Sequence, residues 1–323
     1  MEKDYFDHES PTKISEKYIY DIYCNHYDSI HYLFVEFQFS WLQQAYKALK
    51  DIDKYNILVF LYKENFVELN ELFKVKSLNQ FYINPRFNLD KINIIHISQK
   101  LRLSKETARR KILELEEDGI LIKNKKSIAV TLKAGLLQRP ENTINSFSKI
   151  LQHISYLLHK ETIVKNYYEK EFFIKKINER FTQILGIFLD YQIEYVLARK
   201  ALANNDIELW FITGSLLYNQ IMFLKKSQKK NHYHKEWIDE VLKVGNKKGM
   251  NAMSISDLTG IPRPTVIRKL KILLKQKDIY KDNNNLYYIT KGKLINELNR
   301  LRLNNIRELS SVISRINNII FFS

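Results

Sequence analysis

Lysine, arginine and hydroxyl side chains gather in two short segments of the chain, in a pattern that suits contact with a polyanion. The segments are "LSKETARRKI" (Leu103–Ile112) and "IPRPTVIRKL" (Ile261–Leu270). Ammonium and guanidinium groups bind phosphate oxygens, guanidinium groups also pair with guanine edges, and threonine hydroxyls reach either kind of group. The chemistry that these residue types favour is therefore the binding of nucleic acid, without a catalytic step.

The candidate contacts lie near the start of a predicted helix in each segment and in the hairpin predicted after it. A helix with basic residues at its N-terminal end can enter the major groove of DNA, and the hairpin tip then reaches flanking phosphates or the minor groove. The candidate DNA-contacting residues are Lys105, Glu106, Thr107, Arg109, Arg110, Lys123, Lys125 and Lys126 in the first segment, and Arg263, Thr265, Arg268, Lys269, Lys271 and Lys281 in the second.

The two segments belong to an internal repeat. At an offset of 158, residues 97–115 align with residues 255–273, and the apolar positions within them have the spacing of one buried helical face. Six of the nineteen aligned positions are identical, namely Ile97/Ile255, Ser98/Ser256, Thr107/Thr265, Arg110/Arg268, Lys111/Lys269 and Leu115/Leu273.

The repeat extends beyond the helices on both sides. Gly119–Thr131 and Asp278–Thr290 each have the pattern of strand, polar turn and strand, at an offset of 159. We interpret the change of offset as one residue gained or lost near the end of the preceding helix. Upstream, "YKALKDID" (Tyr46–Asp53) aligns with "RKALANND" (Arg199–Asp206) at an offset of 153.

The two basic helices have different residues at their N-terminal ends. Ser104 is a good N-cap for a helix that runs from Lys105 to about Asp118. In the second copy Pro264 suits the first turn of a helix, where no backbone N–H is missed, and it disfavours helical geometry at the residue before it. We therefore expect Arg263 to take the cap position.

The whole chain of 323 residues reads as two similar halves. Low glycine and proline contents, 8 and 5 residues, favour a mainly α fold with small β-hairpin wings. Residues 1–165 hold a helical segment, a first unit at about 92–135 and a closing helix near Thr143–His159. Residues 166–323 hold a helical segment, a second unit at about 250–292 and a longer closing helix near Leu294–Ile320. The boundary, Glu161–Glu171, lacks glycine and proline, so we expect a helical linker there.

The residues of both units resemble a known family. "ISQKLRLSKETARRKILELEEDGIL" and "ISDLTGIPRPTVIRKLKILLKQKDIY" are similar to the winged helix-turn-helix of bacterial transcription regulators, and "VTLKAG" and "ITKG" resemble the end of the wing in the MarR-like subgroup. The resemblance implies two tandem DNA-reading units framed by helices in a pseudo-two-fold repeat, with Thr107, Arg110, Thr265 and Arg268 at positions that touch DNA. The Asp-x-Arg of the typical MarR wing is missing, which leaves the wing contact undefined.

Composition agrees with an anionic partner inside the cell. The formal net charge is +16, which favours nucleic acid first and a membrane surface second. The single cysteine, Cys24, excludes an internal disulfide, and the polar N-terminus is unlike a signal peptide. No apolar run seen in the sequence approaches the roughly 20 residues of a membrane span. These features predict a soluble, cytoplasmic protein without a membrane partner.

Other kinds of site find little support in the sequence. His232 and His234 are two residues apart with no convincing third ligand, so we expect no metal, and nothing indicates another cofactor. No nucleotide-binding or hydrolase motif is present, so we expect no enzyme. Aromatic residues such as Phe34, Trp41 and Trp210 fit a helical core better than an effector pocket, and a small-molecule effector is without support.

These observations predict a sequence-specific regulator of transcription that binds double-stranded DNA through two recognition helices. The helices differ at Lys105/Arg263, Glu106/Pro264 and Arg109/Ile267, which predicts an asymmetric site. A plasmid or phage replication initiator with tandem winged helices and a winged-helix protein–protein adaptor are the alternatives. A homodimer through the closing helices stays open.

Overall fold

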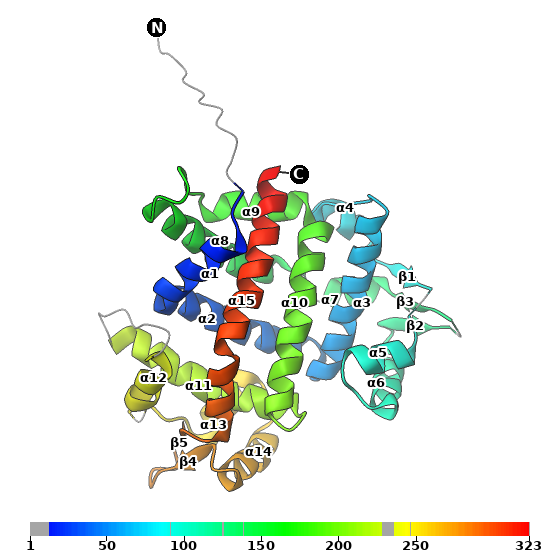
Figure 1. Cartoon of the computed structure of the whole chain (residues 1–323). Coiled ribbons are helices and arrows are strands. Elements are labelled where there is room, and N and C mark those ends of the chain that lie inside the picture. The colour runs from blue at the N-terminus through cyan, green and yellow to red at the C-terminus, as the bar shows by residue number, and fades with distance from the viewer. Residues whose placement is uncertain are drawn as a thin grey trace.

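The computed structural model describes residues 13–90, 92–124, 126–137, 139–227, 236–245 and 247–322. Helix accounts for 73% and strand for 5%, and the strands form two small antiparallel sheets. This confirms the predicted mainly α class. The elements fall into a first half, residues 13–160, and a second half, residues 170–322, which contain similar elements in the same order (Figure 1).

The first half begins with three helices and ends with a closing helix, with a small sheet between them. Its three-stranded sheet has the order β1-β3-β2. The elements are α1 (Glu16–Asn25), α2 (Tyr27–Leu49), α3 (Ile52–Glu71), α4 (Leu78–Ile83), β1 (Phe87–Leu89), α5 (Ile94–Lys100), α6 (Lys105–Glu117), β2 (Leu121–Lys123), β3 (Ile128–Val130), α7 (Leu132–Leu137) and α8 (Glu141–Lys160).

The second half repeats this order with two differences. The counterpart of β1 is reduced to a single antiparallel bridge between Met250 and Tyr287. The closing helix is continuous, whereas Pro140, which precedes α8, separates α7 from α8 in the first half. The elements are α9 (Lys170–Glu179), α10 (Phe181–Leu202), α11 (Ile207–Ser227), α12 (Trp237–Gly245), α13 (Ala252–Thr259), α14 (Arg263–Lys275), β4 (Ile279–Lys281), β5 (Tyr287–Ile289) and α15 (Lys293–Phe322).

Helix ends show which positions of the two halves are equivalent. His26 separates α1 from α2 with φ −116° and ψ 39°, and Arg180 separates α9 from α10 with φ −115° and ψ 40°, an offset of 154. Asp51 caps α3 by accepting a hydrogen bond from the N–H of Lys54, and Asp206 caps α11 in the same way from Leu209. The offset there is 155, so the alignment at 153 predicted from sequence is wrong at this helix start.

The linker between the halves is not helical, contrary to the prediction. The N–H groups of Thr162 and Ile163 turn back to the carbonyls of His159 and Leu158, at 2.9 Å each, and close the end of α8. Thr162 has the left-handed φ of +58° that such a helix end requires. No regular element is assigned between residues 161 and 169, and α9 then begins at Lys170. A helix-ending turn therefore separates the two halves.

The two halves exchange packing partners. The closing helix α15 packs on α1 of the other half, and the closing helix α8 packs on α9 of the other half. The long helices do the same, because α3 packs on α10 and α11 packs on α2. In Figure 1 the red α15 and the green α10 lie side by side through the centre of the molecule. Buried side chains from both halves form one hydrophobic core, so each half completes the fold of the other.

A pair of glutamines marks the centre of this exchange. Gln38 on α2 and Gln192 on α10 occupy equivalent positions at the offset of 154, and each is almost fully buried. The amide of Gln38 donates to Oε1 of Gln192 at 2.9 Å, and the amide of Gln192 donates to Oε1 of Gln38 at 2.8 Å. Each amide thus satisfies the other within the apolar core.

One helix is long and apolar enough to meet the length and composition of a membrane span, which differs from the expectation. This is α11, at residues Ile207–Lys226, and 61% of that apolar stretch is buried inside the protein. It packs on α2, α12 and α13. Packing on several helices explains its apolar composition, because a helix that is covered on most sides is apolar nearly all round.

We expect Gln38→Leu to lower the free energy of unfolding by about 1–3 kcal/mol, because it leaves the buried amide of Gln192 without a partner. The double variant Gln38→Leu/Gln192→Leu should recover most of this loss, because both polar groups are then replaced by apolar ones. Urea denaturation of the wild type, both single variants and the double variant measures the coupling. Additive losses in the double variant would contradict the reciprocal hydrogen bonds.

Candidate nucleic-acid interface

Each half presents two short helices joined by a tight turn and followed by a hairpin. The turn joins α5 to α6 in the first half and α13 to α14 in the second. In both turns a serine holds the geometry: the hydroxyl of Ser98 donates to the carbonyl of Leu103 at 2.8 Å, and that of Ser256 donates to the carbonyl of Ile261 at 2.7 Å. The serine that is identical between the repeats therefore fixes the angle at which the second helix leaves the turn.

The two second helices begin by different means. Ser104 caps α6, as predicted, and its hydroxyl accepts a hydrogen bond from the N–H of Thr107 at 3.0 Å. The prediction that Arg263 caps α14 is wrong. Pro262, in extended geometry with ψ 133°, takes the cap position, and its carbonyl accepts the first helical hydrogen bond, from Val266 at 3.0 Å. Arg263 is therefore the first residue of the helix, and its side chain is exposed.

The hairpins show where the extra residue lies. Gly119 and Lys277 both have left-handed φ values, +69° and +60°, at equivalent places after α6 and α14. The first strands, β2 and β4, keep the offset of 158, and only β3 and β5 move to 159. The extra residue is therefore in the hairpin turn, not at the end of the helix as predicted from sequence. The second hairpin has a turn one residue longer than the first.

The identical lysines of the repeat point into the protein rather than toward solvent. Lys269 is 6% exposed and pairs with Asp206, with Glu208 3.7 Å away. The placement of Lys269 among the DNA contacts is therefore wrong, because its ammonium group is enclosed by carboxylates. Lys111 is 9% exposed and pairs with Asp51 in the same way. In both halves, then, this lysine ties the second short helix to the aspartate that caps a long helix.

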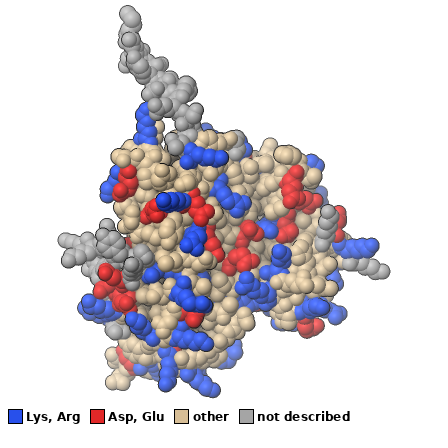
Figure 2. All heavy atoms as spheres, in the orientation of Figure 1, with Lys and Arg blue, Asp and Glu red and all other residues tan. Residues whose placement is uncertain are grey.

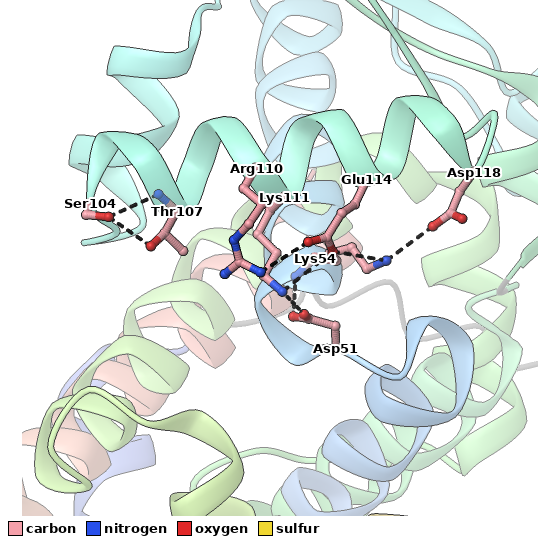
Figure 3. Close-up of polar contacts among 8 residues, drawn as sticks. All are labelled: Asp51, Lys54, Ser104, Thr107, Arg110, Lys111, Glu114 and Asp118. Carbon is pink, nitrogen blue, oxygen red and sulfur yellow. Dashed lines mark hydrogen bonds and ion pairs between the residues drawn. The ribbon is translucent and has the colours of Figure 1, made fainter.

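A larger network of charges surrounds this anchor in the first half (Figure 3). Lys54 on α3 lies 3.2 Å from Asp118 and 3.5 Å from Glu114, at the carboxyl end of α6. Arg110 bends along α6 to pair with Glu114 at 3.2 Å. Figure 3 shows Lys111 pointing from α6 toward Asp51, beside Arg110. Part of the positive charge of Arg110 is therefore offset within the protein.

The remaining predicted contacts lie on the outer surface of the two units. Thr107 and Thr265 are half-buried, and the hydroxyl of Thr107 also accepts a hydrogen bond from Ser104 at 2.8 Å. Lys125 lies outside the described residues. The exposed residues of the predicted set are Lys105, Glu106, Arg109, Arg110, Lys123, Lys126, Arg263, Arg268, Lys271 and Lys281.

The arginine on the second recognition-helix candidate is less neutralised by carboxylates than its counterpart in the first half. Arg268 is the equivalent of Arg110, but position 272 carries isoleucine where the first half has Glu114. Among the described residues, Arg268 forms no ion pair with a carboxylate. Figure 2 shows Lys and Arg side chains gathered at the lower end of the molecule, where α13, α14 and the β4–β5 hairpin lie in Figure 1. This end of the second half is the clearest candidate surface for an anionic partner.

The described residues were also compared with the ligand groups that a metal site needs. Within the residues that the structure describes, no group of three or more His, Cys, Asp or Glu side chains is placed to hold a metal ion. His232 and His234 lie outside the described residues.

Comparisons with known proteins supply no relative. No protein-family model, curated protein or solved structure matches this chain.

The sequence reasoning missed the two aspartates that hold the short helices. Asp51 and Asp206 are far from their lysine partners in sequence, and the alignment at 153 paired Asp206 with Asp53 instead. One signal was present, because each aspartate stands just before an apolar helical run and has the character of an N-cap. As N-caps of α3 and α11, Asp51 and Asp206 are equivalent at the offset of 155.

We expect Lys269→Met to lower the free energy of unfolding by roughly 1–3 kcal/mol, because it removes the ammonium group from a largely buried pair and leaves Asp206 without its partner. Lys271→Met, at an exposed position of the same helix, is the matched control and should change stability little. Chemical denaturation measures both. Unchanged stability of Lys269→Met would contradict the buried pair with Asp206 and leave Lys269 as a candidate DNA contact.

Proposed function

We propose that the chain is a sequence-specific regulator of transcription that binds double-stranded DNA through two winged helix-turn-helix units of MarR-like type. In this proposal α6 and α14 are the recognition helices, and the β2–β3 and β4–β5 hairpins are the wings. The observation that carries the proposal is the contrast within the repeated residues: the identical lysines turn inward to anchor both helices, while Arg110 and Arg268 turn outward.

The pattern of the six identities supports this assignment. Ile97 and Leu115, with their counterparts Ile255 and Leu273, are fully buried, and the serines and lysines have the structural roles described above. Of the six, the threonine position is half-buried and the arginine position is exposed, so full burial explains neither identity. Arginine and threonine at the outer N-terminal part of a helix are residue types that read or grip DNA. In this proposal a shared DNA ligand explains why the half-buried threonine and the exposed arginine are retained.

The exchange of packing partners supports two reading heads at a set distance. Because each closing helix packs on the other half, the two units do not hang on a flexible linker. A dimeric helix-turn-helix protein places its recognition helices in successive major grooves, about 34–36 Å apart. In this proposal one chain does what such a dimer does. The differences Lys105/Arg263, Glu106/Pro264 and Arg109/Ile267 then give two different half-sites.

A mobility-shift assay with random double-stranded DNA at low salt is the first test. Retardation supports the proposal, and its absence would favour a protein-binding role for the two units. Selection of bound fragments from random sequence then reports the length and symmetry of the site. We expect two unlike half-sites at a constant separation, and a true palindrome would contradict the unequal heads.

We expect Arg268→Ala to weaken binding to the selected site by roughly 1–3 kcal/mol if this side chain reads a base. The reason is that Arg268 is exposed on α14 and unpaired with any carboxylate among the described residues. Arg300→Ala is the matched control, because Arg300 is also exposed but lies on α15 and pairs with Glu297. An equal loss on random DNA would make Arg268 a phosphate contact.

We also expect affinity to fall steeply with salt. Each phosphate neutralised contributes about −0.9 to the slope of log affinity against log salt concentration. Titrations at several salt concentrations, by fluorescence anisotropy with labelled DNA, measure this slope. Arg268→Ala should reduce its magnitude by about one if the guanidinium group grips a phosphate. A flat profile would count against the basic faces of α6 and α14 as the interface.

A further inference from the structure

A second carboxylate follows each capping aspartate. Asp53 stands two residues after Asp51 at the start of α3, and Glu208 stands two residues after Asp206 at the start of α11. In both helices this second carboxylate lies in the first turn, where the helix dipole favours a negative charge. Because α3 and α11 also contact each other, the repeat brings four carboxylates toward one another where the two short helices are anchored.

In the first half the two carboxylates pair with two different lysines. Lys111 on α6 pairs with Asp51, and Nζ of Lys200 on α10 lies 2.7 Å from the carboxylate of Asp53. Lys200 is 5% exposed and belongs to the second half, so this ion pair crosses between the halves. Each of the two carboxylates at the start of α3 is therefore matched by a lysine.

In the second half the two equivalent carboxylates share one lysine. Lys269 pairs with Asp206, and its Nζ lies 3.7 Å from the carboxylate of Glu208. The residue equivalent to Lys200, at the offset of 154, is Tyr46. Burial, with Glu208 nearby, raises the pKa of the Tyr46 hydroxyl, so this side chain stays neutral. The start of α11 thus has one carboxylate more than its lysine can match.

Glu208 responds to charges from both halves. Burial raises the pKa of its carboxyl, and Asp206 and Asp51 raise it further, whereas Lys269 and Arg268 lower it. The effect of Arg268 means that its guanidinium group lies near this carboxylate, although these two described side chains form no ion pair. The unmatched carboxylate of the second half therefore lies beside the arginine of α14.

The arginines of α6 and α14 obtain a neighbouring carboxylate from different sources. Arg110 pairs with Glu114 on its own helix, at 3.2 Å (Figure 3). Ile272 occupies the position of Glu114 in the second half, and α14 contains no acidic residue. The carboxylate near Arg268 comes instead from Glu208 on α11, a helix of the core. A carboxylate is thus kept beside this arginine although the residue that supplies it has changed.

We propose that Glu208 is a positioning residue, which holds the guanidinium group of Arg268 toward one place on α14 and so favours a base over the surrounding phosphates. This role rests on the proposed function. An arginine that is already oriented loses less conformational freedom when it binds a base. The same negative charge weakens the attraction of this surface for phosphates in general. Glu208 therefore raises the ratio of specific to random DNA binding.

Glu208→Gln tests this role in the full chain, by fluorescence anisotropy on the selected site and on random DNA. We expect affinity for the selected site to fall about two- to tenfold and affinity for random DNA to stay equal or rise. The variant should fold, because it removes a charge that Asp206 and Asp51 repel. Glu297→Gln, at a half-buried carboxylate of α15, is the matched control. An unchanged ratio in Glu208→Gln would overturn the proposal.

A second variant separates positioning from a merely structural role. Glu208→Gln/Ile272→Glu gives Arg268 a carboxylate on its own helix, as Arg110 has in the first half. Ile272 is exposed, so the substitution needs no repacking of the core. We expect this variant to recover most of the lost ratio, because the guanidinium group again has a partner. A folded variant without recovery would mean that Glu208 acts through the fold, and the proposal would fail.

The pH profile of the ratio gives a further readout. Because the pKa of Glu208 is raised, its carboxylate takes up a proton at a higher pH than an ordinary glutamate does as pH falls. The ratio of the wild type should then decrease from about pH 7 to about pH 5, because protonation removes the attraction for Arg268. Glu208→Gln should change less over this range. Parallel profiles of the two proteins would contradict the proposal.

DNA binding by the wild type separates this proposal from the proposed function. If the wild type binds no double-stranded DNA, the proposed function fails and the role of Glu208 fails with it. If the wild type binds DNA and Glu208→Gln keeps the same ratio, the role of Glu208 fails alone.

Discussion

The buried pairing of a lysine with a helix-capping aspartate is the interaction on which the two candidate surfaces depend. Asp51 caps the N-terminus of α3 and also pairs with the ammonium group of Lys111. Asp206 caps α11 and pairs with Lys269 in the same way. One carboxylate therefore does two jobs, and it couples the direction of a long core helix to that of a short surface helix. Since α3 and α11 are themselves packed on the opposite half, the orientation of each outer helix is set by residues from both halves.

The exchange of closing helices makes a single rigid core, to which the two lysine–aspartate pairs attach α6 and α14. If each half folded by itself, α6 and α14 would move with separate bodies, and the separation between them would vary. Instead α15 packs on α1 and α8 packs on α9, so each closing helix ties its own half to the other half.

The sequence predicts the local elements well and the long-range ones poorly. Periodicity, Ser104 and the repeated hairpin pattern led to helices and strands close to those observed, and the closing helices were found within a few residues. The errors share one cause, which is that they depend on partners distant in sequence. Lys269 looks like a surface lysine until Asp206 is brought beside it. Matching residue types in the sequence misplaced the helix start at Asp206 and the extra hairpin residue. The hydrogen bonds of the helix caps and strands define the correct equivalences.

The reciprocal bonds between Gln38 and Gln192 carry a consequence for the history of the chain. A glutamine amide is both donor and acceptor, so the same residue placed on both sides of a two-fold axis satisfies itself, as the contacts of an isologous dimer must. A half-length ancestor with one glutamine at this position would have needed no second residue type to assemble with its own copy. Fusion of two such genes would free every position away from the axis to diverge. It would leave these two residues bound to change together, because a change in either one removes the partner of the other.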